Sequence, residues 1–490
     1  MVAIVYSGGM WGIEGFPVEV QVDISSGLPS FNIVGLPDSA VKEAKERVRS
    51  ALKNSGFGFP LKRITVNLSP SDRKKAGTHY DLPIALGILE ATGSLKTRDY
   101  IILGELSLSG ELKKVSGILA LLISLKEKGF KNFIVPEENA EEGSLIKDIN
   151  VYTFSTLKEV VDFLRGKLKK NCLTFKKLEK KKGVHEDLRD VKGQILGKRA
   201  LEISAAGFHH LLLVGSAGAG KSMLAKRIKS ISPPMEFEEV LEVSKIYSIY
   251  GRDELITERP FHSPHHTSSE IALIGGGNPP KPGVISLAHR GYLLLDEMAE
   301  FPKKTIEALR QPLEEGRVQI SRAGNNVVFP ADFTLIGTMN PCPCGNYKNP
   351  FKECVCSEKE IKAYNKKISE PIKDRIDLKV WIYPLKEEEL LTLPEGESSE
   401  RVKKRVETAY NIQKERCVFN GRLSNEKVNE YCIKLMERGA KTLLKEAVRS
   451  LKLSARSYYK LLKVSRTIAD LDESEKIKDE HIAEALQFRI

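Results

Sequence analysis

The sequence predicts a multidomain α/β protein made of three folded parts and one linker. The parts are an α+β domain over residues 1–165, a P-loop α/β core over residues 186–390 and a helical domain over residues 391–490. Strand and helix signals alternate in the first part, a glycine loop between a strand and a helix marks the second, and the pattern after Pro394 is helical. A chain of 490 residues has room for about three domains.

The N-terminal part has no P-loop of its own. Residues 18–23 alternate apolar and polar side chains, which indicates a half-buried strand. Residues 37–52 indicate an amphipathic helix with one apolar face, formed by Val41, Ala44, Val48 and Leu52. Further strands are expected at 64–68, 100–103 and 133–135, and further helices at 82–89 and 117–128.

A glycine loop at residues 215–222 is the strongest motif of the chain. It reads Gly-Ser-Ala-Gly-Ala-Gly-Lys-Ser and lies between an apolar run at 210–214 and a helical run at 223–228, which is the context of a Walker A P-loop. Because every fixed position is present, a chance glycine loop is disfavoured. We therefore predict ATP and Mg²⁺ as cofactors, with the nucleotide held by Gly215, Ser216, Ala217, Gly218, Ala219, Gly220, Lys221, Ser222 and Met223.

Two acids end the next buried strand. Leu293-Leu-Leu-Asp-Glu297 has the Walker B pattern, in which Asp296 and Ser222 hold Mg²⁺ and Glu297 orients the attacking water. A buried strand with capping acids is the alternative, and the distance of about 75 residues from the P-loop disfavours it.

These motifs resemble those of AAA+ ATPases, and the resemblance implies further site residues. Asn340, after an apolar strand, corresponds to sensor 1, and Arg456 corresponds to sensor 2, which reaches the γ-phosphate from the helical lid. Gln194 borders the adenine pocket. Arg375 corresponds to an arginine finger given to a neighbouring subunit, which implies a ring and a homo-hexamer. The alternative for Arg375 is a salt bridge to a neighbouring aspartate.

The segments around the motifs resemble a narrower family. The helix-2 insert of magnesium-chelatase-type ATPases is similar to residues 260–267, 274–278 and 282–289, and residues 337–341 and 466–471 also match that type. With residues 31–38 and the N-terminal domain, essentially the whole chain resembles the YifB/ComM group of Mg-chelatase-like AAA+ ATPases. This resemblance implies a DNA helicase for branch migration in natural transformation, with single-stranded or branched DNA as partner.

The N-terminal domain also resembles the proteolytic domain of Lon, which has an S5-like fold. Residues 104–112 and 129–136 carry this resemblance. Lon proteases use a serine–lysine dyad, but the corresponding positions here hold Asp81 and Leu119. An aspartate cannot act as that acyl-forming nucleophile and a leucine cannot accept its proton. We expect a Lon-like domain without protease activity that serves in binding or assembly.

Basic residues suggest where a polyanion would bind. The net charge is +12, and nine basic residues with one acid fall in the linker at 165–185. Residues 317–329 indicate a β-hairpin, and related ring ATPases place such a hairpin in the pore, where Arg317 and Arg322 suit phosphate contacts. Lys281, in the 275–283 loop, is a second candidate. The alternatives are a plain edge hairpin and a solvated linker.

Four cysteines lie close together in the core sequence. Cys342 and Cys344 form one C-x-C pair and Cys354 and Cys356 form another. Four thiolates suit a tetrahedral structural Zn²⁺; the alternatives are reduced free thiols or a redox pair. The histidines His262, His265 and His266 are expected to be packed or hydrogen-bonded and not metal ligands.

The composition suggests a cytoplasmic protein. No apolar run is long enough to span a bilayer, no signal peptide is evident, and the cysteines do not form a disulfide framework. The leading hypothesis is an ATPase motor acting on DNA. A magnesium-chelatase motor subunit and an AAA+ protein acting on a protein partner remain as rivals, with the Lon-like domain and the cysteine pairs counting against the chelatase.

Overall fold

The computed structural model describes residues 2–97, 99–176, 183, 185–252, 255–277, 280–322 and 325–489, with the side chains of 322, 325, 387 and 390 excepted. Most lysines at the end of the basic linker, the turn residue Gly324 and the side chain of Arg322 therefore lie outside the described residues. The chain divides into two compact units, Met1–Lys180 with Phe237–Ile256, and Lys181–Glu236 with Thr257–Ile490.

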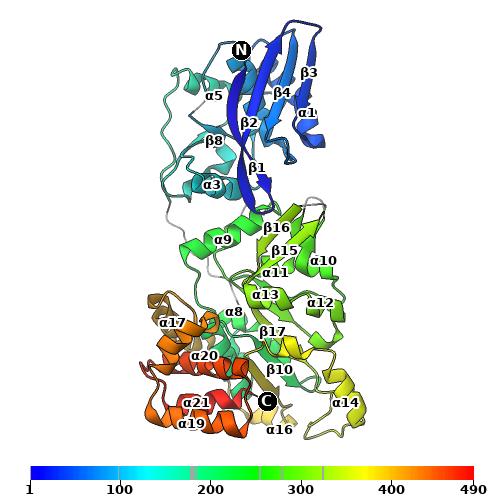
Figure 1. The fold of residues 1–490 in the computed structure, drawn as a ribbon, viewed down its shortest axis with the longest axis vertical. Helices are drawn as coiled ribbons and strands as arrows, with labels where there is room; N and C mark the ends of the chain where they lie inside the picture. The colour runs from blue at the N-terminus through cyan, green and yellow to red at the C-terminus, as the bar shows by residue number, and fades with distance from the viewer. Residues whose placement is uncertain are drawn as a thin grey trace. The chain divides into compact units, whose positions relative to one another are not determined.

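The N-terminal unit is built on a seven-stranded sheet in the order β3-β4-β2-β1-β5-β8-β9 (Figure 1). The β1–β2 and β2–β4 pairs are antiparallel and the other pairs are parallel, so the expected mixed strand-and-helix pattern is found. The strands are β1 (Ala3–Trp11), β2 (Glu14–Ser25), β3 (Ser30–Val34), β4 (Arg63–Ser69), β5 (Ile101–Ile102), β8 (Asn132–Pro136) and β9 (Asn150–Phe154), and β6 (Glu105–Leu106) pairs with β7 (Leu112–Lys113).

Helices cover this sheet as the apolar patterns predict. The predicted apolar face of α1 is buried, and the Asp38 carboxylate caps the helix by accepting a hydrogen bond from the backbone N–H of Val41. The helices of the unit are α1 (Ser39–Asn54), α2 (Asp81–Ala91), α3 (Ile118–Glu127), α4 (Ala140–Ser144), α5 (Leu157–Leu164) and α9 (Phe237–Ser248).

The helix α9 comes from the sequence that follows the P-loop, yet it packs in the N-terminal unit. It lies against α3, where Leu241 and Leu255 pack on the hydrophobic cluster around Leu121. A single domain boundary near residue 185 is therefore too simple, since the chain passes between the units after residues 180, 236 and 256.

The second unit is built on a parallel five-stranded sheet in the order β11-β14-β17-β10-β18. Every residue of β14 and β17 is buried, as expected for strands covered on both faces. Its strands are β10 (Leu211–Gly215), β11 (Phe261–His262), β14 (Tyr292–Leu295), β17 (Thr334–Met339) and β18 (Leu378–Ile382). Two hairpins are added, β12 (Gly275–Gly276) with β13 (Lys281–Pro282), and β15 (Arg317–Arg322) with β16 (Asn325–Pro330).

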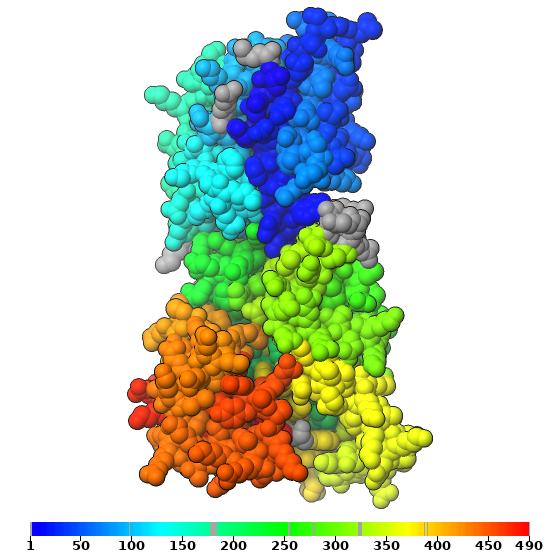
Figure 2. All heavy atoms as spheres, viewed as in Figure 1, coloured from blue at the N-terminus to red at the C-terminus, as the bar shows by residue number. Residues whose placement is uncertain are grey.

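The C-terminal helices share one hydrophobic core with this sheet. Val406, Leu461, Ile468 and Ile482 belong to the same buried cluster as Leu213 of β10. Figure 2 shows these helices, in orange and red, as a contiguous mass. They are α17 (Ser399–Glu415), α18 (Asn425–Val428), α19 (Arg438–Ser450), α20 (Ala455–Leu471) and α21 (Asp479–Gln487).

The predicted helical pattern is interrupted between 425 and 439, because α18 is followed by a π-helical turn at Asn429–Ile433 and a break before α19. The remaining helices of the unit are α6 (Ile195–Gly207), α7 (Lys221–Lys226), α8 (Ile228–Ile231), α10 (Glu270–Ile274), α11 (Val284–Leu287), α12 (Lys303–Glu307), α13 (Arg310–Glu315), α14 (Glu358–Asn365), α15 (Glu370–Lys373) and α16 (Glu387–Thr392). None of the described helices is both long and apolar enough to cross a membrane.

Candidate nucleotide site

The P-loop joins β10 to α7 at the carboxyl edge of the parallel sheet, where open α/β sheets bind ligands. Gly215 is pressed against β18, because a Cβ atom there would lie 2.1 Å from the carbonyl oxygen of Ile382. Gly220 has a φ of 86°, in the left-handed region that favours glycine. The local sequence therefore produces the predicted strand–loop–helix turn.

Lys221 lies at the centre of this loop. Its Nζ donates hydrogen bonds to the carbonyl oxygens of Gly215 and Ser216, each at 2.7 Å, and to Asn340 Oδ1 at 3.1 Å. Burial lowers the pKa of Lys221, and the nearby Asp296 and Glu297 oppose this shift. The structure thus brings the predicted P-loop lysine and sensor 1 asparagine into direct contact.

Asp296 receives two hydroxyl hydrogen bonds. Ser222 Oγ and Thr338 Oγ1 both donate to Asp296 Oδ1 at 2.6 Å. A carboxylate beside a hydroxyl is an oxygen donor set that suits Mg²⁺, so these residues fit the predicted metal. The sequence reasoning gave no role to Thr338, although it lies beside Asn340 in the stretch 337–341 that resembles the chelatase type.

Thr338 also fixes Glu297. The backbone N–H of Glu297 donates to Thr338 Oγ1 at 3.0 Å, and its φ of 52° is left-handed, which is uncommon for a residue other than glycine. Such backbone strain concentrates at functional sites. The backbone of Glu297 is therefore held in place beside Asp296, while its side chain is exposed.

Gln194 connects two parts of the site. Its Nε2 donates to the carbonyl oxygen of Tyr383, after β18, at 2.6 Å and to that of Ala219 at 3.4 Å. It therefore links the P-loop to the end of β18, next to the place expected for the adenine. Ser216 Oγ is buried and has no hydrogen-bond partner among the described residues, while Met223 is 50% exposed.

Arg375 and Arg456 lie at the opposite edge of the sheet. Arg375 lies just before the start of β18, whereas the P-loop with Lys221 follows the end of β10. Because β18 and β10 are parallel and each has five residues, Arg375 and Lys221 lie at opposite edges of the sheet. At about 3.3 Å per residue this separates the two edges by roughly 16 Å. Both arginines line a cavity of 880 Å³ that also includes Glu314 and Lys460 but none of the P-loop residues.

Glu314 holds both arginines. Arg375 Nη2 forms an ion pair with it, and Arg456 Nη2 lies 3.3 Å from Glu314 Oε1. The hydrogen bond from Arg375 lowers the pKa of Glu314. The predicted alternative partner of Arg375, a neighbouring aspartate, is thus replaced by Glu314, and Arg456 is not close to the nucleotide site of its own chain. Arg375 Nε is buried without a hydrogen-bond partner among the described residues, so it retains a free donor.

The two hairpins pack together at Gly275, where a Cβ atom would lie 3.0 Å from Ile320 of β15. Arg317 lies at the base of its hairpin, opposite Pro330, and its Nε is 3.2 Å from Glu315. Arg322 is opposite Asn325, next to the turn. Lys281 is exposed on β13, opposite Gly276. The predicted hairpin is confirmed, and of its two arginines only Arg322 stands next to the tip.

The predicted metal cluster is assembled, since the sulfur atoms of Cys342, Cys344, Cys354 and Cys356 all lie within 4.8 Å of one another. It is the only such group found among the described residues. His265 is exposed, with its Nδ1 2.8 Å from Thr267 Oγ1 and its ring 4.1 Å from that of His266, so it is hydrogen-bonded, one of the two expected alternatives.

In the N-terminal unit, Asp81 is fully buried and held by Arg47. Arg47 Nε and Nη2 donate to its two carboxylate oxygens at 2.7 and 3.1 Å, and the backbone N–H of Leu106 donates at 3.3 Å. Burial raises the pKa of Asp81 to about 6. Leu119 is 3% exposed and belongs to a hydrophobic cluster. An ion pair and an apolar core residue therefore stand at the positions aligned with the Lon dyad.

We expect purified protein to leave casein intact with or without ATP, because the buried Asp81 carboxylate paired with Arg47 cannot replace the acyl-forming serine and Leu119 cannot replace its lysine base. Gel analysis over several hours measures this, and Asp81→Asn is the control for a contaminating protease. ATP-stimulated cleavage that a substitution of a nearby serine abolishes would show that the alignment is shifted.

Known protein families and relatives match nearly the whole chain. The family model for magnesium chelatase, subunit ChlI, matches residues 187–390, and its C-terminal model matches residues 396–489. The chain is 42% identical over 501 residues to competence protein ComM of Haemophilus influenzae, and 41% identical over 496 residues to YifB of Salmonella typhimurium, which is described as uncharacterized. Both alignments cover 99% of this chain and 97% of the relative.

Similarity to a chelatase subunit is more limited. The magnesium-chelatase 67 kDa subunit of Chlorobaculum parvum is 30% identical over 156 residues, which is 31% of this chain and 23% of that protein. A further family model, described as subunit ChlI of Mg-chelatase, matches residues 20–139. The N-terminal domain therefore cannot be used as an argument against the chelatase rival, contrary to our expectation from the sequence.

Proposed function

The chain belongs to the YifB and ComM group of magnesium-chelatase-like proteins, and from this membership we propose that it is an AAA+ ATPase that forms a hexameric ring and remodels DNA. Strand separation or branch migration during natural transformation or recombination is the activity we assign to it. The name of the relative, competence protein ComM, supports this setting.

The observation that carries the proposal is the placement of Arg375 and Arg456 at the sheet edge opposite Lys221. Phosphoryl transfer needs positive charge at the γ-phosphate, and neither arginine can supply it to the nucleotide of its own chain. A neighbouring copy that presents its arginine edge to the P-loop edge completes the site. Repetition of this head-to-tail contact generates a ring.

The residues of one chain divide the chemistry between them. MgATP supplies the phosphoanhydride that is hydrolysed. Lys221 contacts the β- and γ-phosphates, Ser222 and Asp296 hold Mg²⁺, and Glu297 orients the attacking water. Asn340 keeps the Lys221 ammonium in position through the 3.1 Å hydrogen bond between them.

Two rivals remain to be tested. A magnesium-chelatase motor subunit is supported by the family descriptions, but the 30% identity to the Chlorobaculum parvum subunit covers only 31% of this chain. A remodeller of a protein partner is compatible with the same ring, because a pore can hold either DNA or a polypeptide.

The test that separates the DNA proposal from both rivals is ATPase activity without DNA and with single-stranded, duplex and branched DNA. We expect DNA to stimulate turnover, and an unchanged rate with all three would reject the proposal.

Changing Arg317 and Arg322 together to alanine should weaken DNA binding and flatten its salt dependence, because fewer counterions are released. In a ring of six the loss is repeated in every subunit, so we expect affinity at low salt to fall about tenfold or more. Basal ATP hydrolysis should be retained, because the hairpin residues lie outside the Lys221 and Asp296 contacts. DNA affinity measured against salt concentration tests this.

The matched control is Lys303→Ala with Lys304→Ala, which removes the same charge from exposed residues of α12. Charge reversal of the linker lysines tests the other basic segment. Because Arg317 is paired with Glu315 at the hairpin base, the single variant Arg322→Ala should account for most of the loss. Unchanged affinity and slope in the double variant would remove the hairpin from the DNA path.

A further inference from the structure

We propose that Cys342, Cys344, Cys354 and Cys356 bind one zinc ion, and that the zinc loop, defined as residues 342–356, forms a wall of the nucleotide site and keeps Asn340 in place. The metal site stands on its own geometry. Its role as a wall rests on one part of the proposed ATPase function, namely that the P-loop site binds nucleotide.

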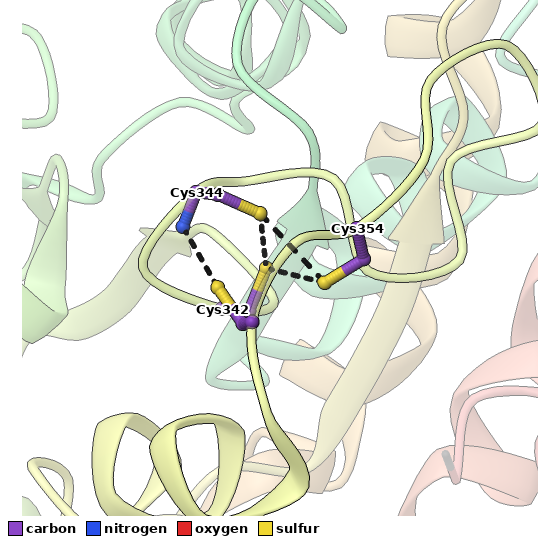
Figure 3. Close-up of side chains that lie close together, drawn as sticks. Cys342, Cys344 and Cys354 are labelled. Carbon is purple, nitrogen blue, oxygen red and sulfur yellow. Dashed lines mark hydrogen bonds between the residues drawn. The ribbon is translucent and has the colours of Figure 1, made fainter.

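The sulfur positions fit a zinc ion better than the alternatives. Cys342 Sγ lies 3.5 Å from Cys344 Sγ and 3.7 Å from Cys354 Sγ, and Cys344 and Cys354 are 3.7 Å apart (Figure 3). A tetrahedron with Zn–S bonds of about 2.3 Å has sulfur–sulfur edges of about 3.8 Å. The thiols are all free, and a disulfide would need sulfurs about 2.05 Å apart.

Backbone groups support the same sulfurs. The N–H of Cys344 donates to Cys356 Sγ at 3.4 Å, and the N–H of Tyr347 donates to Cys342 Sγ at 3.3 Å. Such hydrogen bonds stabilise the negative charge of thiolates that bind a metal. The convergence of four sulfur atoms, together with these hydrogen bonds, indicates one shared metal ion.

Apart from the cysteines, short turns support the zinc loop, through hydrogen bonds from the N–H of Gly345 to the Cys342 carbonyl oxygen and from the N–H of Asn349 to the Asn346 carbonyl oxygen. The loop contains no helix or strand between β17 and α14. Its large apolar side chains point outward, since Val355 is 85% exposed, Phe351 47% and Tyr347 38%. An irregular segment of this length without a hydrophobic core needs a cross-link, and a structural zinc ion supplies one.

The first half of the zinc loop adjoins the nucleotide site. Cys342 is two residues after Asn340, which accepts the hydrogen bond from Lys221. Gly345 faces the P-loop, because a Cβ atom there would lie 3.6 Å from the backbone nitrogen of Ala217. Farther along, Lys348 Nζ lies 5.1 Å from the centre of the Trp381 ring on β18. Loss of the metal would release Asn340 and this wall together.

The test uses the full chain and measures zinc and nucleotide binding separately from turnover. Elemental analysis of wild-type protein should give one zinc per chain. Cys354→Ser should lose the zinc and bind MgATP roughly tenfold more weakly, the size expected when a hydrogen bond to a charged group is lost. Cys354→His should retain both properties, because three cysteines and a histidine also bind zinc. Cys417→Ser, at an exposed cysteine outside the loop, is the matched control.

Removal of zinc from wild-type protein by a chelator, followed by its return, gives the same comparison if Cys354→Ser does not fold. Loss and recovery of MgATP affinity would support the proposal. Absence of zinc with four titratable thiols in the native protein would overturn the metal site. Zinc-free protein with unchanged MgATP affinity would overturn the wall. Zinc-dependent MgATP binding without any hydrolysis would contradict the proposed function and leave this inference standing.

Discussion

Replacing Glu297 with glutamine should lower kcat for ATP hydrolysis by about 100-fold or more and leave MgATP affinity nearly unchanged. The expected size is that of a general base or water-orienting group, about 10²–10⁴ in rate. Glutamine has the shape of glutamate, and the backbone hydrogen bond from residue 297 to Thr338 does not involve the side chain. The hydrogen bond between Ser222 and Asp296, the residues proposed to hold Mg²⁺, is therefore preserved. Steady-state hydrolysis tests the change in kcat, and a separate binding titration tests the MgATP affinity.

The control for this variant is Glu300→Gln, three residues farther along. Glu300 is exposed and pairs with Lys367 at 3.2 Å, so its loss should cost little activity. If Glu297→Gln hydrolyses ATP at the wild-type rate, Glu297 has no part in orienting the water. A parallel loss of MgATP affinity would instead assign it to the metal site.

Replacing Arg375 with alanine should abolish hydrolysis, and mixing that variant with Lys221→Ala should restore part of it. An arginine finger contributes about 10³–10⁵ to the rate of phosphoryl transfer. Arg375→Ala chains keep an intact P-loop, and Lys221→Ala chains keep an intact Arg375. Where the two meet in a mixed ring, a complete site forms at their interface. The measurement is ATPase activity against the mixing ratio at constant total protein.

Two controls separate this mechanism from a structural salt bridge. Glu314→Gln removes the carboxylate that Arg375 and Arg456 share but leaves both arginines. A structural role predicts that this change is as harmful as Arg375→Ala, whereas a finger predicts that activity survives. Mixing Lys221→Ala with Glu297→Gln should restore nothing, because no interface then has a complete site. Absence of recovery in the Arg375 mixture would contradict completion of the site by a neighbour.

The same mixture with Arg456→Ala in place of Arg375→Ala tests the second arginine. Because both arginines contact Glu314 and line one cavity, we expect the same recovery for Arg456. Recovery of only the Arg375 variant would mean that Arg456 stabilises the arginine edge without reaching the phosphate.

Much of the fold follows from local patterns in the sequence. The four apolar positions of α1 are buried as predicted, and the P-loop lies between β10 and α7. Hydrophobic periodicity specifies such elements because the spacing of apolar side chains has to match the geometry of a helix or strand. The Lys221 motif and the acids after β14 are recognisable for a related reason, since phosphate and Mg²⁺ accept few residue types at fixed spacing.

The tertiary structure alone decided which residues meet. The sequence did not indicate that Thr338 would hold Asp296 and Glu297, because a threonine in a buried strand has no distinctive pattern. It gave no sign that α9 would pack in the N-terminal unit, since an amphipathic helix does not specify its partner. It assigned Arg456 to the γ-phosphate without indicating which chain holds that nucleotide, and the direction of the parallel strands puts the arginine with Arg375 at the far edge. Motifs specify chemistry through short-range spacing, but the side on which a residue acts depends on contacts between segments that are distant in the chain.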